Sequence, residues 1–88
     1  MIIACTYQVE SPYIASYRLV EDEHYVVVAV LLRPVFGRAQ RDAALASIAD
    51  DVARQTDKEV WVTADLDIWS KCASLEAGEL VEILRTRV

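Results

Sequence analysis

Hydrophobic and polar residues alternate along the first third of the chain with the two-residue period of β-strands. Residues 1–9 carry an apolar side chain at every second position from Ile3, until Glu10-Ser11-Pro12 breaks the pattern. The alternation resumes with the apolar residues Tyr13, Ala15, Tyr17 and Leu19. The polar sequence Glu21-Asp22-Glu23 then indicates a tight turn. We therefore predict two strands, 1–9 and 13–19, and a hairpin.

A continuous apolar run follows the turn. Residues 25–32 read Tyr-Val-Val-Val-Ala-Val-Leu-Leu, which suits a central strand that is covered on both faces or pressed against a partner. Pro34 cannot donate a hydrogen bond to a sheet, and Gly37 permits unusual backbone angles. Residues 33–37 are therefore predicted to be a loop.

Residues 38–56 have the period of an amphipathic helix. The apolar positions at spacings i, i+3, i+4 and i+7 are Leu45, Ile48, Ala49 and Val52. Charged residues lie largely elsewhere on the helix, where Arg38 can pair with Asp42 and Asp50 with Arg54. A helix with one buried face is the expected result.

The C-terminal third predicts one strand and two helices. Residues 59–63 form the strand, and a right-handed crossover through the preceding helix places it parallel to the strand at 26–32. Asp65 or Thr63 is expected to cap a short helix, and Ser74 to cap the last one. The apolar sides of these two helices carry Leu66, Trp69 and Cys72 in the first, and Leu80, Ile83 and Leu84 in the second.

Together these elements predict a single α+β domain over residues 1–88, in the order β-β-β-α-β-α-α. We expect a two-layer sandwich, with a mostly antiparallel four-stranded sheet and helices on one face. The length of 88 residues leaves no room for a second domain.

Composition narrows the class of partner. The chain is acidic, with a net charge of −5, and this charge repels nucleic acid. Its apolar fraction of 55% favours self-association, so we expect a homo-oligomer or a protein partner. No apolar stretch has the length of a transmembrane segment. Cys5 and Cys72 are predicted to be free thiols, with a disulfide between them as the alternative.

The sequence contains no motif of an established catalytic or cofactor site. With two glycines in the chain, the glycine-rich loops that bind phosphates are missing. Asp65 and Asp67 resemble a weak metal-binding pair, but both fit the first turn of a helix. His24 beside acidic residues also fits a polar turn. We predict no enzyme activity, no cofactor, no metal and no catalytic residue.

Exposed aromatic side chains are the strongest candidates for an interaction surface, because aromatic residues are common at binding hot spots. The candidate interface residues are Tyr13, Tyr17, Tyr25 and Trp61. Their positions on strands also fit packing within the protein.

Residues 27–72 resemble the YhcN/YlaJ family of sporulation lipoproteins. The resembling elements are the valine-rich strand at 26–30, the helix ending Ile48-Ala49-Asp50-Asp51-Val52, and above all the segment from Val60 to Trp69. Members are generally exported and lipid-anchored. The resemblance implies a noncatalytic, spore-associated domain in the spore or envelope, whereas the sequence by itself indicates the cytoplasm.

The leading hypothesis is a noncatalytic protein-interaction or assembly module, associated with sporulation, in which the open edge or uncovered face of the sheet meets another protein or copy. One alternative is a small-ligand or metal-binding domain that uses Asp65, Asp67, His24 or Cys72. The other is a cytosolic regulatory protein that binds a larger partner.

Overall fold

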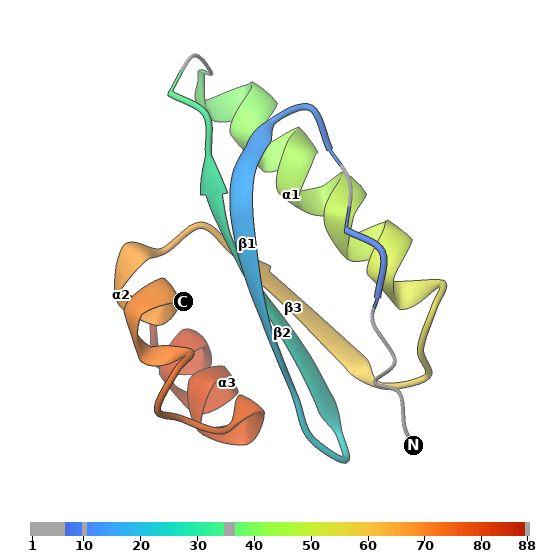
Figure 1. The fold of residues 1–88 in the computed structure, drawn as a ribbon, viewed down its shortest axis with the longest axis vertical. Coiled ribbons are helices and arrows are strands. Elements are labelled where there is room, and N and C mark those ends of the chain that lie inside the picture. The colour runs from blue at the N-terminus through green and yellow to red at the C-terminus, as the bar shows by residue number, and fades with distance from the viewer. Residues whose placement is uncertain (1–6, 10, 35–36, 88) are drawn as a thin grey trace.

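The computed structural model of the protein describes residues 7–9, 11–34 and 37–87. Its elements in chain order are β1 (Ile14–Glu21), β2 (Tyr25–Leu32), α1 (Arg38–Ala53), β3 (Glu59–Thr63), α2 (Leu66–Lys71) and α3 (Ala77–Thr86). Figure 1 shows the three strands side by side, with helices to either side of them. The predicted α+β class is confirmed.

β2 is the central strand of a mixed sheet with the order β1-β2-β3. β1 pairs with β2 in the antiparallel sense, and β3 pairs with β2 in the parallel sense. The hairpin and the parallel position of β3 were both predicted. The described residues form three strands rather than four, and the prediction of a mostly antiparallel sheet is not confirmed, since one of the two pairings is parallel.

The end of the predicted first strand has a different conformation. Residues 1–6 lie outside the described residues, and residues 7–9 are not a strand. The backbone of Gln8 bonds to the Gln55 side chain instead, with its N–H donating to Oε1 at 2.8 Å and its carbonyl accepting from Nε2 at 3.0 Å. Val9 is buried against the sheet, as the alternation predicted. The side-chain amide of Gln55 thus makes the two hydrogen bonds to the Gln8 backbone that a neighbouring strand would make in a sheet.

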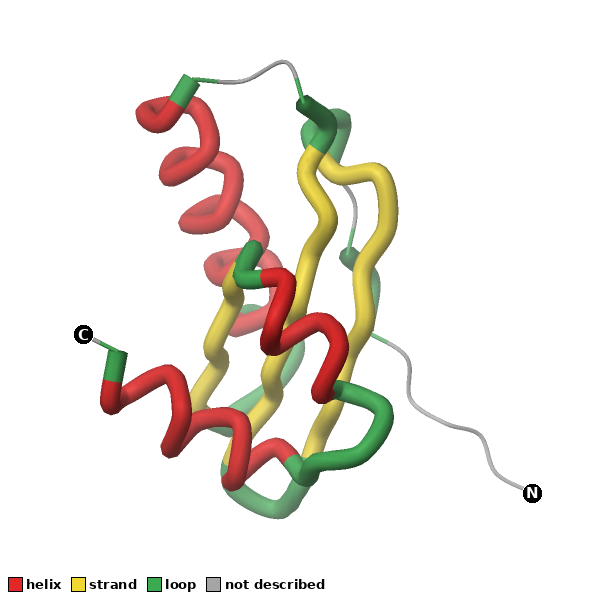
Figure 2. Tube along the Cα trace, turned by 90° about the vertical axis from the view of Figure 1, so that its left-hand side faces the viewer, coloured by secondary structure: helices red, strands yellow, loops and turns green. Residues whose placement is uncertain are grey.

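Helices cover both faces of the sheet, so the prediction of two layers with helices on one face is wrong. Figures 1 and 2 show α1 on one face and α2 with α3 on the other. On the α1 face, Val26, Val28 and Val30 form a core cluster with Ile48 and Val52 of the helix. The other face has its own apolar cluster, which contains Val27, Ala29, Ile68, Ala77, Leu80 and Val81.

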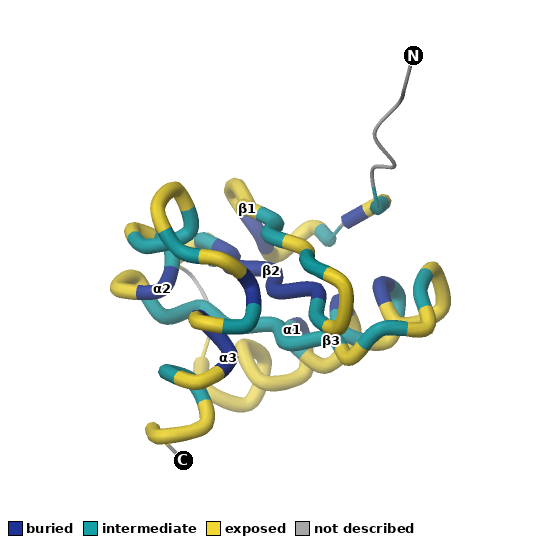
Figure 3. The backbone as a smooth tube through the Cα atoms, turned by 90° about the horizontal axis from the view of Figure 1, so that it is seen from below, coloured by how far each residue is buried: buried dark blue, intermediate teal, exposed yellow. Residues whose placement is uncertain are grey.

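The composition of β2 explains the two cores. Successive side chains of a strand point to opposite faces, and residues 26–30 are all apolar and all buried. Each face therefore needs a covering layer. Figure 3 shows the buried positions concentrated along β2 between the helices.

Hydrogen bonds at the helix ends decide where the two short helices begin. The Asp65 carboxylate accepts from the backbone N–H of Asp67 at 2.8 Å and caps α2 as predicted. The predicted cap of α3 is wrong, because this helix begins after Glu76 rather than after Ser74. Glu79 Oε1 accepts from the Glu76 N–H at 3.1 Å. A side chain in the first turn of α3 thus provides a hydrogen-bond partner for the backbone N–H of the residue that precedes the helix.

Helix α1 begins at the predicted residue and ends at Ala53, three residues earlier than predicted. Its expected ion pairs do not form among the described residues. Arg54 pairs with Asp51 rather than with Asp50, and the Arg38 side chain pairs with no other side chain that the structure describes.

Candidate functional site

The structure separates the four candidate interface residues into two pairs. Tyr13 and Tyr17 lie at the outer strand β1 and are 40% and 38% exposed. Tyr25 and Trp61 lie on the neighbouring strands β2 and β3 and are half-buried. The sequence identified all four as aromatic strand residues, and the sheet order assigns them to two different environments.

Tyr25 and Trp61 pack beneath an arginine of helix α3. The guanidinium of Arg85 lies 5.7 Å from the centre of the Tyr25 ring and 5.9 Å from that of Trp61. The indole N–H of Trp61 donates to Glu59 Oε2 at 2.5 Å, and Arg85 forms an ion pair with the same carboxylate at 3.5 Å. These contacts hold α3 against the sheet through cation–π and charged interactions.

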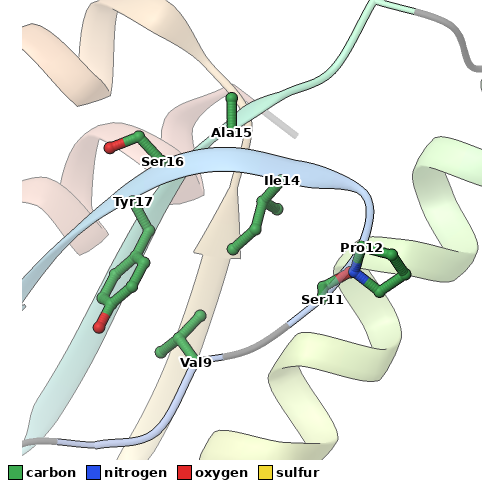
Figure 4. A pocket seen from close by; sticks show the side chains of 7 residues that line it. All are labelled: Val9, Ser11, Pro12, Ile14, Ala15, Ser16 and Tyr17. Carbon is green, nitrogen blue, oxygen red and sulfur yellow. The ribbon is translucent and has the colours of Figure 1, made fainter.

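Tyr17 borders a shallow groove beside β1. The groove has a volume of about 840 Å³. Figure 4 shows Tyr17 and Ile14 extending from β1 on the side where Val9 lies, while Ala15 and Ser16 extend from the opposite side. The register of β1 against β2 shifts between Ile14 and Ser16, in the part of β1 that lines the groove. A register shift of this kind turns a strand locally and redirects its side chains.

Within the described residues, the outer backbone of β1 has no partner strand. The Asp22 N–H donates to the Tyr25 carbonyl at 2.9 Å, which makes these two residues a hydrogen-bonded pair. In an antiparallel ladder, residues alternate between bonding inward and facing outward. Tyr17, Leu19 and Glu21 therefore direct their N–H and C=O groups away from β2. No residue among those that the structure describes bonds to these outward groups.

A charged cluster forms around the Glu21 side chain at one end of this edge. Glu21 Oε2 accepts hydrogen bonds from Lys58 Nζ and from the Tyr7 hydroxyl, each at 2.6 Å. The bond from Lys58, followed by that from Tyr7, lowers the pKa of Glu21. The carboxylate raises the pKa of Lys58 in turn. The cluster ties the N-terminal segment and the start of β3 to the end of β1.

The residues of the ligand- and metal-binding alternative do not form one site. Asp65 and Asp67 lie together, and both accept from the Arg87 guanidinium. Asp67 also pairs with Lys71 at 3.0 Å. His24 lies in the β1–β2 turn, at the opposite end of the sheet from α2. Across the described ranges, no three histidine, cysteine or acidic side chains are close enough together to hold a metal ion.

Cys72 follows α2 and packs against the core cluster on that face. Burial raises the pKa of its thiol, and a raised pKa disfavours the reactive thiolate. Cys72 is a free thiol, as predicted, whereas Cys5 lies outside the described residues.

A second hollow was not identified from the sequence. It lies at the carboxyl ends of the parallel strands β2 and β3, has a volume of about 300 Å³, and is lined by Arg33, Arg41 and Leu66 among others. Leu66 was predicted to face the core with Trp69, but it is 65% exposed, and Ile68 is buried in its place. The available signal was the density of arginines between residues 33 and 41 of an acidic chain.

Comparisons of the chain with protein-family models, curated proteins and solved structures found no match. The resemblance to the YhcN/YlaJ family therefore stays a prediction. None of the helices in the described residues has the length and apolar character needed to cross a membrane.

Proposed function

We propose that this protein is a noncatalytic interaction module that binds an extended protein segment along the outer edge of β1. The observation that carries the proposal is the outward-facing backbone of Tyr17, Leu19 and Glu21 on β1. Tyr17 also lines the groove. An exposed strand edge offers a ready set of main-chain donors and acceptors, and peptide-binding domains commonly use such edges. The sequence also suggested an uncovered apolar face of the sheet as the binding surface. That suggestion is wrong, because helices cover both faces.

The side chains beside the edge suit a peptide partner. Tyr17 and Tyr13 are exposed aromatic residues, which contribute strongly to binding where a partner covers them. Val9 and Ile14 provide an apolar floor to the groove. The partner is a second copy of the chain or another protein, and the family resemblance alone connects this activity with sporulation.

The ligand-binding alternative through Asp65 and Asp67 has less support, because Arg87 and Lys71 already neutralise both carboxylates. Binding of a cation there would have to displace these side chains.

The test follows the β1 amides by NMR. A ¹⁵N-labelled sample is studied over a concentration series and after mixing with unlabelled extract of its own host cells. We expect changes centred on the amides of Tyr17, Leu19 and Glu21, and slower hydrogen exchange at these amides when the partner is bound.

Two variants with the same change in net charge complete the experiment. Tyr17→Lys places a charge at the edge and should abolish the changes, since lysine at an edge strand opposes pairing. Ser47→Lys changes an exposed position of α1 and should behave as wild type. The proposal fails if the β1 amide signals change neither in the concentration series nor in the mixture with extract. It also fails if the Tyr17→Lys and Ser47→Lys variants bind the partner equally well.

A further inference from the structure

The arginines that line the 300 Å³ hollow differ from the other basic residues of the chain. The chain has nine basic residues. Six of them bind acidic side chains or a backbone carbonyl, and these are Arg18, Arg54, Lys58, Lys71, Arg85 and Arg87. The other three, Arg33, Arg38 and Arg41, form no side-chain hydrogen bond or ion pair within the described residues.

The position of these three arginines is unexpected in an acidic protein. Acidic residues outnumber basic ones by fourteen to nine, so acidic partners are plentiful. The arginines nevertheless occupy one short stretch of the chain, and two of them line the same hollow. Uncompensated positive charge at a concave site favours a negatively charged ligand.

The remaining walls of the hollow are apolar. Leu32, Pro34, Ala64 and Leu66 line it together with the two arginines. Leu66 has the largest exposed fraction of the large apolar side chains described, at 65%. The hollow lies at the carboxyl ends of two parallel strands, a usual position for ligands in folds that contain such strands. Its volume is at the lower end of the range for small-molecule sites.

The acidic side chains that border the neighbouring hollow pair with other basic residues. Asp65 and Asp67 border an adjoining hollow that shares Arg41 and Leu66. Both carboxylates are occupied by Arg87, and Asp67 also by Lys71. Among the residues that the structure describes, no acidic side chain forms an ion pair with Arg33 or Arg41, and both charges can therefore attract a ligand.

From this arrangement we infer that the hollow at the carboxyl ends of β2 and β3 binds a small organic carboxylate with a short aliphatic chain. The planar guanidinium groups of Arg33 and Arg41 match a carboxylate, to which arginine can donate two parallel hydrogen bonds. Leu66, Pro34 and Ala64 would cover the aliphatic chain and remove it from water. This site is separate from the β1 edge, and its test does not depend on the proposed function.

The experiment is an NMR titration of the ¹⁵N-labelled protein with hexanoate at low salt. We expect saturable shifts at the amides of Leu32, Ala64 and Leu66. Hexanamide has the aliphatic chain without the charge, and acetate has the charge without the chain. Each should bind at least about tenfold more weakly than hexanoate, since each lacks one of the two interactions.

Two arginine variants test whether the charge of Arg41 binds the carboxylate of hexanoate. Arg41→Gln should weaken hexanoate binding about tenfold, the size expected for a lost hydrogen bond to a charged group. Arg54→Gln changes another exposed arginine near the far end of the same helix and should leave the affinity unchanged. The spectra of both variants also report whether the fold is intact.

Several results would overturn the inference. These are the absence of saturable shifts, equal binding of hexanoate and hexanamide, and equal affinities of wild type and Arg41→Gln. An acetylated peptide with a C-terminal leucine tests whether the hollow instead binds the C-terminus of a protein. If it bound more than tenfold more tightly than hexanoate at the same amides, the site would belong to a protein terminus rather than to a small carboxylate.

Discussion

At the scale of single residues, Asp22 connects the β1–β2 turn to helix α3. Its Oδ1 accepts from the N–H groups of His24 and Tyr25 at 2.8 Å, and its Oδ2 accepts from the Gly78 N–H at 3.0 Å. A β-carbon at Gly78 would lie 3.3 Å from the same carboxylate, so glycine permits this close approach. One side chain thus shapes the turn and positions the start of α3.

These hydrogen bonds predict a pH-dependent contribution of Asp22 to stability. The bond from the His24 N–H is the largest cause that lowers the pKa of Asp22 below its ordinary value of 3.8. A lowered pKa in the folded state means that the contribution is fully present above the ordinary pKa and is lost as the pH falls through the folded value. We expect Asp22→Ala to lower the melting temperature at pH 7 and to approach wild type at the acidic end of a pH series.

Glu23→Ala is the control for this measurement, because Glu23 is an exposed neighbour in the same turn. It should change the melting temperature less than Asp22→Ala does. If the melting temperature of Asp22→Ala stayed equally far below that of wild type throughout the acidic range, the charged carboxylate would not be the stabilising form.

At the scale of elements, β2 determines the number of layers. Val27 faces α2 and α3, whereas Val28 faces α1, and both side chains are completely buried. Threonine has nearly the shape of valine but buries a hydroxyl group, which costs about 1–3 kcal/mol without a partner. We expect Val27→Thr and Val28→Thr each to lower the free energy of unfolding by about this amount in urea titrations. If the free energy of unfolding of one variant stayed within about 0.5 kcal/mol of wild type, the helices would not bury the sheet face that carries the substituted valine.

At the scale of the whole molecule, the two cores share one strand, so they are expected to unfold together. Trp61 and Trp69 pack in the cluster on the α2 and α3 face, whereas Val52 is buried in the other cluster. Val52→Ala should lower the free energy of unfolding by about 2 kcal/mol through lost apolar burial. Tryptophan fluorescence and far-ultraviolet circular dichroism should report the same shift. A fluorescence transition that did not move would show that the two sides unfold separately.

The candidate sites show the limit of prediction from the sequence. The sequence identifies Tyr13, Tyr17, Tyr25 and Trp61 only as aromatic residues on predicted strands. They differ in the structure because Arg85, which is 60 residues from Tyr25 in the chain, packs over Tyr25 and Trp61, whereas the sheet order places Tyr17 on an outer strand. Leu66 was likewise predicted to be buried, because its spacing from Trp69 fits a helical stripe. Six residues of helix offer too short a pattern to determine which side faces the sheet.

The sequence by itself determined the local structure. Period-two alternation, the valine-rich run and the helical spacing of Ile48 and Val52 predicted β1, β2 and α1, because local geometry controls which side chains share a face. It also predicted the parallel position of β3, since a strand–helix–strand unit returns in that direction. Only the tertiary structure decided which helices cover each face, which strands lie at the edges of the sheet and which arginines line the second hollow. These properties depend on contacts between segments that are far apart in the chain, and a local pattern does not encode them.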